Sequence, residues 1–219
     1  MSDLPRRVVA ESIGTAALVA AVVGSGVAAT RLSPGQPGLQ LLVTSLVTGA
    51  ALLALITVLQ PVSAAFNPVV TLVALAHREI TGRDAGALVV AQVSGGVAGA
   101  VVANLMYDLD AVSVAATTRA SPAHLLAEVV ATAGLVVLVR GCAPDRVAVV
   151  VASYVTAAYW FTSSTSFANP AVTLARTFSD TFAGIAPSSV PAFLLAQLVG
   201  ATLAAVTAAW LFERTPARA

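Results

Sequence analysis

Long apolar stretches alternate with short polar segments along this chain of 219 residues. Six stretches approach the roughly 20 residues that an α-helix needs to cross a bilayer. They lie near residues 8–30, 39–60, 85–106, 123–141, 146–162 and 190–212. Two further apolar segments, near 68–77 and 170–178, are too short to cross alone. The pattern predicts an all-α membrane protein with six transmembrane helices and two half-length helices.

Both short segments begin with the same dipeptide. Asn67-Pro68 opens the first and Asn169-Pro170 opens the second, and the chain has no other Asn-Pro pair. Asparagine is a favourable N-cap and proline fits the first helical position, so each pair predicts a helix that starts abruptly inside apolar sequence. Irregular backbone is tolerated at membrane depth only where it is buried in protein or lines a wet cavity. We therefore expect the two pairs to line a pore.

The two halves of the chain, about 1–110 and 118–219, carry matching motifs in the same order. Each half has an Ala-Glu pair in its first span, an Asn-Pro pair, and an Ala-Gln pair in its third span. The charged and amide residues of these pairs are Glu11 and Glu128, and Gln92 and Gln197. Because each half has three full spans, the halves insert in opposite orientations and form an inverted repeat within one transmembrane domain, 1–219. The two half-helices then meet from opposite sides.

Composition and charge agree with a lipid environment. The chain is 58% hydrophobic and 10% charged, against about 25% charged residues in soluble domains. A net charge of +1 provides no basic face for nucleic acid. With the N-terminus in the cytoplasm, all arginines except Arg31, Arg119 and Arg176 lie inside. We therefore expect a multi-pass protein of the inner (cytoplasmic) membrane with both termini cytoplasmic.

No enzyme signature is found in the sequence. It has no phosphate-binding glycine loop, no zinc-type Cys/His cluster and no nucleophile triad. Its single Cys142 cannot form an internal disulfide. We expect no cofactor, no metal and no catalytic residue, so the choice lies between a channel and a carrier.

The paired Asn-Pro motifs, each preceded by Ala-Glu in the first span of its repeat, resemble the major intrinsic protein family of aquaporins and aquaglyceroporins. This resemblance covers the whole chain and implies a passive channel for small uncharged solutes and water, assembled as a homotetramer with one pore per subunit. It implies pore motifs at Asn67, Pro68 and Val69, and at Asn169, Pro170 and Ala171. The first motif departs from the family at Val69, where alanine is usual.

The buried carboxylates of Glu11 and Glu128 allow two interpretations. The family resemblance implies that each accepts hydrogen bonds from backbone N–H groups of a re-entrant loop. The alternative is an ion-coupled secondary transporter of a small polar solute, because an intramembrane carboxylate is a functional candidate by default.

The predicted selectivity filter also departs from the family pattern. Val172 stands three positions after Asn169, where water-selective members and most glycerol channels have arginine. By the family's spacing, the other filter positions fall on Ala157, Ser166 and Thr48, or on Val47 in an alternative register. A ring without an aromatic side chain or a fixed cation predicts a wide and mildly polar filter.

The segment Asn169–Ile185, with its valine, resembles a bacterial branch of the family often linked to arsenic resistance. Arsenous acid and methylated arsenicals are therefore candidate permeants beside glycerol and water, and urea, hydrogen peroxide and ammonia compete. Arg176 lies one helical turn beyond Val172, about 6 Å along the axis. We expect it in the outer vestibule, paired with Asp180; the alternative is that it replaces the missing filter arginine.

Overall fold

The structure is a computed structural model that describes residues 3–212, and it contains eight α-helices and no β-strand within that range. The long helices are α1 (Leu4–Leu32), α2 (Pro37–Leu59), α4 (Gly82–Met106), α5 (Pro122–Gly141), α6 (Val147–Phe161) and α8 (Val190–Phe212). The short helices are α3 (Pro68–Ala76) and α7 (Pro170–Ala175). Three 3₁₀ turns complete the secondary structure: η1 (Pro144–Arg146), η2 (Arg176–Phe178) and η3 (Pro187–Ser189). The predicted all-α fold class is confirmed.

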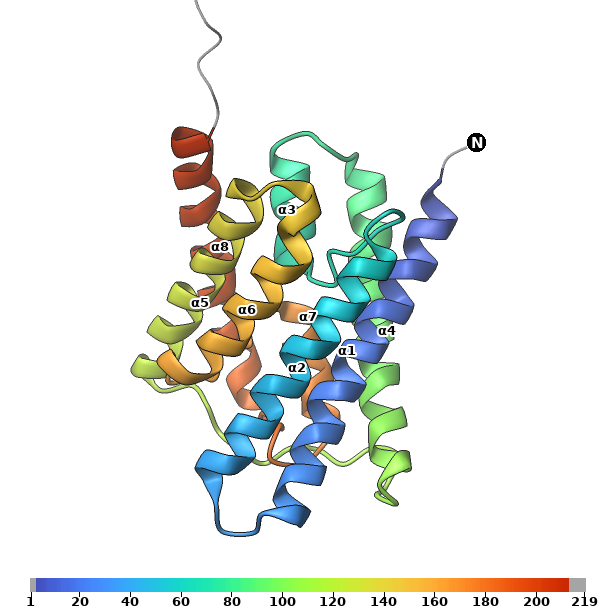
Figure 1. The fold of residues 1–219 in the computed structure, drawn as a ribbon, viewed down its shortest axis with the longest axis vertical. Coiled ribbons are helices and arrows are strands. Elements are labelled where there is room, and N and C mark those ends of the chain that lie inside the picture. The colour runs from blue at the N-terminus through green and yellow to red at the C-terminus, as the bar shows by residue number, and fades with distance from the viewer. Residues whose placement is uncertain (1–2, 213–219) are drawn as a thin grey trace, which may run out of the picture.

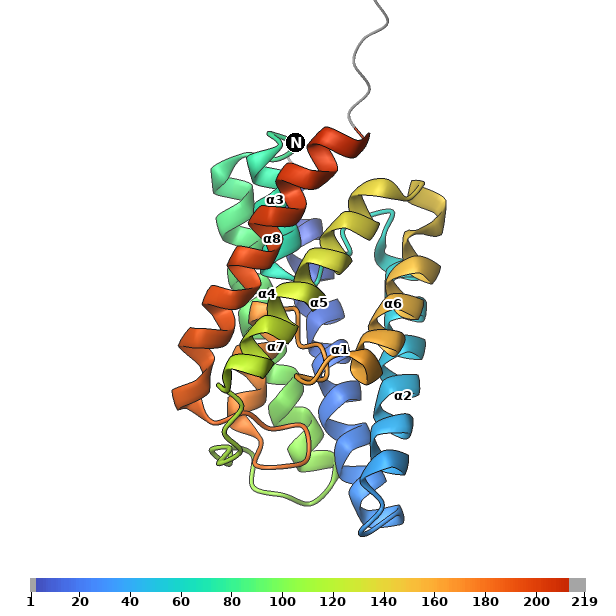
Figure 2. The same ribbon diagram turned by 90° about the vertical axis from the view of Figure 1, so that its left-hand side faces the viewer.

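The long helices surround the two short ones. The start of α1 and the end of α8 lie at one end of the bundle, and the loop between α1 and α2 lies at the opposite end (Figures 1 and 2). Helix α3 occupies the half near the termini and α7 the other half. The two short helices therefore approach the middle of the molecule from opposite ends.

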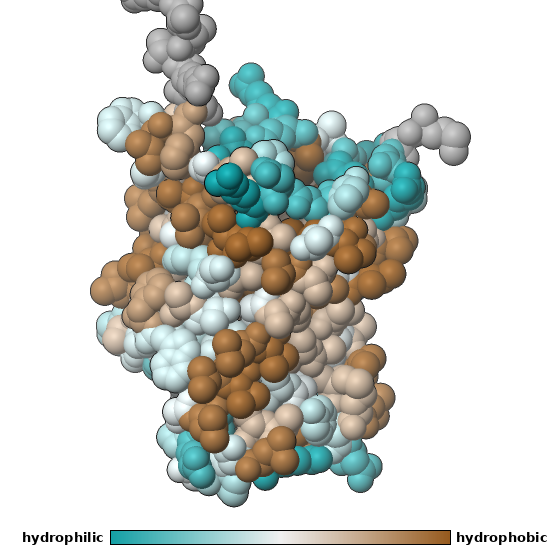
Figure 3. All heavy atoms as spheres, in the orientation of Figure 1, coloured by the Kyte–Doolittle hydropathy of each residue, from teal (hydrophilic) through white to brown (hydrophobic). Residues whose placement is uncertain are grey.

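Five helices are long and apolar enough to cross a membrane, namely α1, α2, α4, α5 and α8 extended by η3. The sixth predicted crossing helix, over 146–162, is present as α6 but has only 15 residues. It is shorter because Pro144–Arg146 forms a separate 3₁₀ turn and the extended backbone of Thr162 ends the helix. Apolar side chains cover much of the outer surface between more polar ends (Figure 3), as expected for a multi-pass membrane protein.

Glycines allow the helices of each half to pack closely. A Cβ atom at Gly95 of α4 would lie 2.3 Å from the carbonyl oxygen of Ser12 in α1. In the second half, a Cβ atom at Gly200 of α8 would lie 2.5 Å from the carbonyl oxygen of Val129 in α5. Small residues at such contacts let helix backbones approach each other in membranes. The pairs α1–α4 and α5–α8 thus use the same packing device.

Both Asn-Pro pairs cap their helices as predicted. Asn67 and Asn169 have extended backbones, and each proline occupies the first helical position. The side-chain oxygen of Asn67 accepts from the N–H of Val69 at 3.1 Å. The oxygen of Asn169 accepts from the N–H groups of Ala171 and Val172 at 3.0 and 3.3 Å. Each half-helix therefore begins at its asparagine.

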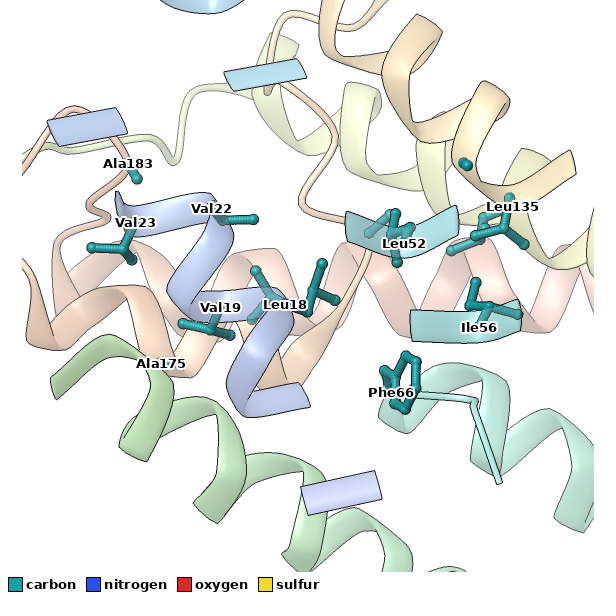
Figure 4. Close-up of a cluster of buried hydrophobic side chains, with 14 of the residues drawn as sticks. Leu18, Val19, Val22, Val23, Leu52, Ile56, Phe66, Leu135, Ala175 and Ala183 are labelled. Carbon is teal, nitrogen blue, oxygen red and sulfur yellow. The ribbon is translucent and has the colours of Figure 1, made fainter. Parts of the chain in front are cut away.

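The largest apolar cluster joins α1, α2, α5 and α6 with residues of α4, α7 and the loop before α3. Figure 4 shows some of its members, including Leu18 and Val22 of α1, Leu52 and Ile56 of α2, and Phe66. These five side chains also line the central cavity described below. Arg214 and Arg218, two of the arginines expected inside, lie outside the described residues.

Candidate functional site

A cavity of about 90 Å³ lies where the two half-helices meet. Aliphatic side chains make up much of the wall: Leu18, Val22, Leu52, Ile56, Val70, Leu135, Val139, Val147, Val151, Val155 and Val172. Polar side chains are few: Thr48, Asn67, Tyr159, Ser166, Asn169 and Arg176. A mostly apolar wall with a few polar groups suits small uncharged solutes.

The two motif asparagines connect the halves of the chain across this cavity. The side-chain nitrogen of Asn67 donates to the carbonyl oxygen of Ala168 at 2.8 Å. The side-chain nitrogen of Asn169 donates to the carbonyl oxygen of Phe66 at 2.7 Å. Each amide has two N–H donors, and within residues 3–212 one N–H of each asparagine has no protein acceptor. The asparagines therefore have a structural role in joining the two halves, and their role as donors to a solute stays a prediction.

Glu11 organises the loop that leads into α3. Its carboxylate accepts from the hydroxyl of Ser63 (2.6 Å), from the N–H groups of Ala65 (2.8 Å) and Phe66 (2.7 Å), and from the amide of Gln92 (2.8 Å). The residue is fully buried. Buried carboxylates are tolerated when several donors satisfy them, so this glutamate holds the re-entrant loop in place.

Glu128 does the same for the loop before α7. It accepts from the N–H groups of Phe167 and Ala168, both at 2.9 Å, and from the amide of Gln197 at 2.6 Å. That amide also bonds the hydroxyl of Thr173 in α7 at 2.9 Å. Glu128 is fully buried, and among the described residues neither it nor Glu11 is part of the cavity wall. The geometry matches the loop-holding interpretation of both glutamates.

The loops that Glu11 and Glu128 hold contain left-handed residues that are not glycine. The residue before each motif asparagine has a positive φ, 49° at Phe66 and 45° at Ala168. Thr165 and Ser166 also have positive φ, at 62° and 51°. Such backbone is costly and persists where surrounding contacts over-determine it, often at functional sites. Glu11 and Glu128 supply such contacts at Phe66 and Ala168, and the N–H of Ser166 donates to the hydroxyl oxygen of Ser164 at 3.3 Å.

Thr48, Ser166 and Val172, three of the four predicted filter residues, line the cavity. Thr48 is 3% exposed, whereas Val47 is 38% exposed and lies outside the wall, so the structure favours the register with Thr48 inside. The hydroxyl of Ser166 has no hydrogen-bond partner among the described residues. That oxygen is itself buried, so the residue contributes to the wall without presenting an exposed hydroxyl.

The fourth predicted position, Ala157, is misplaced. It is exposed on the outer face of α6, and Tyr159 lines the cavity instead. Two residues turn a helix by about 200°, so the family's spacing selects the wrong face of α6. The signal that finds Tyr159 is the four-residue period of Val147, Val151 and Val155, which all line the same cavity.

Tyr159 changes the predicted character of the ring, which was expected to lack an aromatic side chain. Its hydroxyl shares a hydrogen bond with that of Thr48 at 3.1 Å. The residue is 6% exposed. The wall therefore contains an anchored phenol beside the small residues expected from the sequence.

Arg176 is buried, at 4% exposure, and its predicted ion pair with Asp180 is absent among the described residues. Its Nε donates to the carbonyl oxygen of Ala183, and its guanidinium carbon lies 3.5 Å from the centre of the Phe167 ring. The exposed Asp180 instead accepts from the N–H of Ala116 at 3.0 Å. The loop after η2 folds back onto Arg176, and that contact replaces the ion pair.

A second cavity of about 240 Å³ lies beyond the first. Its wall includes Pro37 and Leu41, at the start of α2, so it opens toward the end of the bundle opposite the start of α1. We call this cavity the vestibule. Arg176 and Tyr159 line both cavities and so mark the boundary between them.

Comparison with known proteins connects this geometry to a family. Residues 1–150 match the family model described as major intrinsic protein. The chain is 49% identical over 220 residues to aquaglyceroporin AqpS of Rhizobium meliloti (strain 1021), covering 99% of this chain and 93% of that protein. Its fold is similar to the X-ray structure of the aquaglyceroporin from Plasmodium falciparum, with a TM-score of 0.73, 18% identity, and coverage of 97% and 96% of the two chains.

Proposed function

Because the chain belongs to the major intrinsic protein family, we propose that it is a passive channel whose filter admits glycerol, arsenous acid or methylated arsenicals as well as water. Members of this family are channels and not enzymes. The observation that carries the proposal is the central cavity, where Asn67 and Asn169 face an otherwise mostly aliphatic wall. An uncharged solute can exchange hydrogen bonds with the two amides and needs no coupled ion.

The ion-coupled alternative has no support from the site. A proton-coupled carrier needs a carboxylate that reaches the transport route. Here Glu11 and Glu128 are occupied by loop N–H groups, and among the described residues no Asp or Glu side chain lines the cavity. Flux should therefore follow the solute gradient alone.

Val172 supports the proposal of a wide filter. An arginine would add about four non-hydrogen atoms and five fixed N–H donors to the wall. Valine leaves that space open beside Thr48, Ser166 and Tyr159. Solutes bulkier than water, including glycerol and arsenous acid, gain cross-section and an apolar contact. The name of the Rhizobium relative, an aquaglyceroporin, agrees with this class of solute.

We further propose that the protein lies in the cytoplasmic membrane with both termini inside, as the arginine distribution favours. Family membership supports a homotetramer with one pore per subunit as part of this proposal. Crosslinking in native membranes tests this assembly, with a four-subunit band as the expected product. A monomer in both membranes and mild detergent would contradict it.

The experiment that tests the channel is a swelling panel on proteoliposomes with water, glycerol, urea and arsenous acid. Ionophores that collapse the proton and sodium gradients should leave every downhill rate unchanged. If collapsing either gradient stopped net downhill flux, the carrier alternative would replace the channel.

A substitution at Val172 tests the filter. Val172→Arg should lower the ratio of glycerol to water permeability by about tenfold, because the added side chain fills space in the central cavity and leaves less room for the bulkier solute. Val172→Leu is the matched control, since it adds bulk without charge and should lower the ratio less. An unchanged ratio in a folded Val172→Arg protein would remove Val172 from the filter.

A further inference from the structure

The vestibule has an unusual charge pattern. Its polar wall consists of Thr44, Arg119, Tyr159, Thr165 and Arg176, and the other residues of the wall are apolar. Two of these side chains are arginines, and no Asp or Glu among the described residues lines the cavity. Two positive charges therefore face one partly enclosed space without a carboxylate beside them.

Both guanidinium groups are held against one aromatic ring. The guanidinium carbon of Arg119 lies 5.4 Å from the centre of the Phe167 ring, and that of Arg176 lies 3.5 Å from it. Such cation–π contacts fix the plane and position of a guanidinium. The two cations are thereby fixed close together, where their mutual repulsion is little screened by water.

The backbone carbonyls of three successive residues, 182–184, accept hydrogen bonds from the two guanidinium groups. Arg119 donates from Nη2 to Phe182 at 3.1 Å and from Nε to Gly184 at 2.9 Å. Arg176 donates from Nε to Ala183. These neutral acceptors position the guanidinium groups without neutralising them. The segment 182–184 therefore arranges both arginines before any solute arrives.

Several N–H donors remain unused. A guanidinium has five, and Arg176 spends only the one on Nε on a protein acceptor within the described residues. Its Nη1 and Nη2 therefore have no protein acceptor there, and the side chain lines the vestibule although the residue is only 4% exposed. Arg119 likewise keeps Nη1 free of any protein acceptor in residues 3–212.

Two acidic side chains on segments near the arginines, Glu128 and Asp180, bond to backbone N–H groups. Glu128 accepts from the loop N–H groups of Phe167 and Ala168. Asp180 is exposed and accepts from the N–H of Ala116. Neither contributes to the vestibule wall. Among the described residues no carboxylate forms an ion pair with Arg119 or Arg176, so their unused N–H donors are left for a ligand.

We propose that the vestibule binds one small oxyanion, such as a carboxylate or inorganic phosphate, between Arg119 and Arg176. Planar forks of N–H donors match carboxylate and phosphate oxygens and make strong charge-assisted hydrogen bonds. The site goes beyond the proposed channel function, since binding there requires no conduction. Arg176 and Tyr159 also line the central cavity, so a bound oxyanion obstructs the route of neutral solutes.

Thermal unfolding of the full chain in detergent tests the site. Titration with sodium acetate or sodium phosphate at constant ionic strength, balanced with sodium chloride, should raise the melting temperature saturably. Arg176→Ala and, separately, Arg119→Ala should weaken the apparent affinity by about tenfold or more, the effect of losing a charge-assisted hydrogen bond. The apparent affinity of Arg176→Lys should lie between those of wild type and Arg176→Ala, because lysine keeps the positive charge but lacks the planar set of N–H donors.

Arg31→Ala is the matched control. Arg31 also stacks on an aromatic ring, 5.4 Å from the centre of Tyr107, and donates to a backbone carbonyl at 2.7 Å, but it lies outside the vestibule wall. Its removal should leave the anion response unchanged. An equal response in wild type, Arg31→Ala and both vestibule variants would show a general salt effect and overturn the site, as would no response in wild type.

A flux measurement gives the second readout. Acetate or phosphate added to wild-type proteoliposomes should lower glycerol flux, and the inhibition should require a higher concentration in Arg119→Ala. Undiminished glycerol flux at concentrations that saturate the thermal response would contradict obstruction. If the channel proposal fails because wild type conducts nothing, the thermal titration still decides whether the oxyanion binds.

Discussion

Replacing Glu128 with glutamine tests whether the buried carboxylates are structural. In the native protein both carboxylate oxygens accept backbone N–H groups, one from Phe167 and one from Ala168. A glutamine has one oxygen and one NH₂ group. It can therefore accept one of the two N–H groups, and its own NH₂ group then faces the other.

The cost can be estimated from these contacts. A buried N–H group that loses its acceptor costs about 1–3 kcal/mol, and the remaining bond loses the extra strength of a charged acceptor, about 1 kcal/mol. Weakening the bond from Gln197, which is 2.6 Å long, adds to this. We expect Glu128→Gln to lower the free energy of unfolding by about 3–5 kcal/mol, a large part of a typical total.

The assay combines thermal unfolding in detergent with glycerol flux in proteoliposomes. Glu11→Gln should behave like Glu128→Gln, because its carboxylate also accepts two consecutive loop N–H groups. Glu79→Gln is the control. Its carboxylate pairs with Arg140 at a side-chain exposure of 47%, and such exposed pairs contribute about 1 kcal/mol or less.

One result would refute this reasoning. If Glu128→Gln kept wild-type stability while its flux lost a dependence on the proton gradient, the carboxylate would be a transport group. The protein would then be a carrier, and the loop would be held by something other than Glu128.

Three other changes have expected outcomes. Asn169→Leu removes a cap worth about 1 kcal/mol and the bond to Phe66, so glycerol flux should collapse; full flux through a folded variant would exclude Asn169 from the pore. Gly95→Ala should lower the melting temperature, because its Cβ would meet the Ser12 carbonyl at 2.3 Å. Gly86 lies on the exposed side of α4, where an added Cβ has no atom within 4 Å, so Gly86→Ala should leave the melting temperature unchanged or raise it slightly. A lower melting temperature for Gly86→Ala than for Gly95→Ala would contradict the packing described for α4.

Features that depend on local chemistry could be predicted from the sequence. Asn-Pro fixes the start of α3 and of α7 through the capping preference of asparagine and the fixed φ of proline. The long apolar runs likewise predict α1, α2, α4, α5 and α8. In each case the residues that determine where the helix forms lie in the helix itself or next to it in the sequence.

Features that depend on distant segments could not be predicted. Arg176 is turned toward Ala183 and Phe167 by the loop after η2, and helical spacing alone suggests Asp180 as its partner. The placement of Ala157 failed because it relied on counting back through the irregular loop before Asn169, whose residues include several with positive φ. Packing against the other helices decides which side of α6 faces the cavity, and a count of residues along the chain gives no information about that packing.

The reciprocal bonds between Asn67 and Ala168 and between Asn169 and Phe66 make the two halves of the chain depend on each other. In each loop a backbone carbonyl accepts a hydrogen bond from the asparagine side chain of the other half. Loss of either asparagine therefore leaves a carbonyl of the other half without its hydrogen-bond donor. Near the centre of the membrane little water is present to take the place of that donor. The duplicated halves therefore fold and unfold as one cooperative unit.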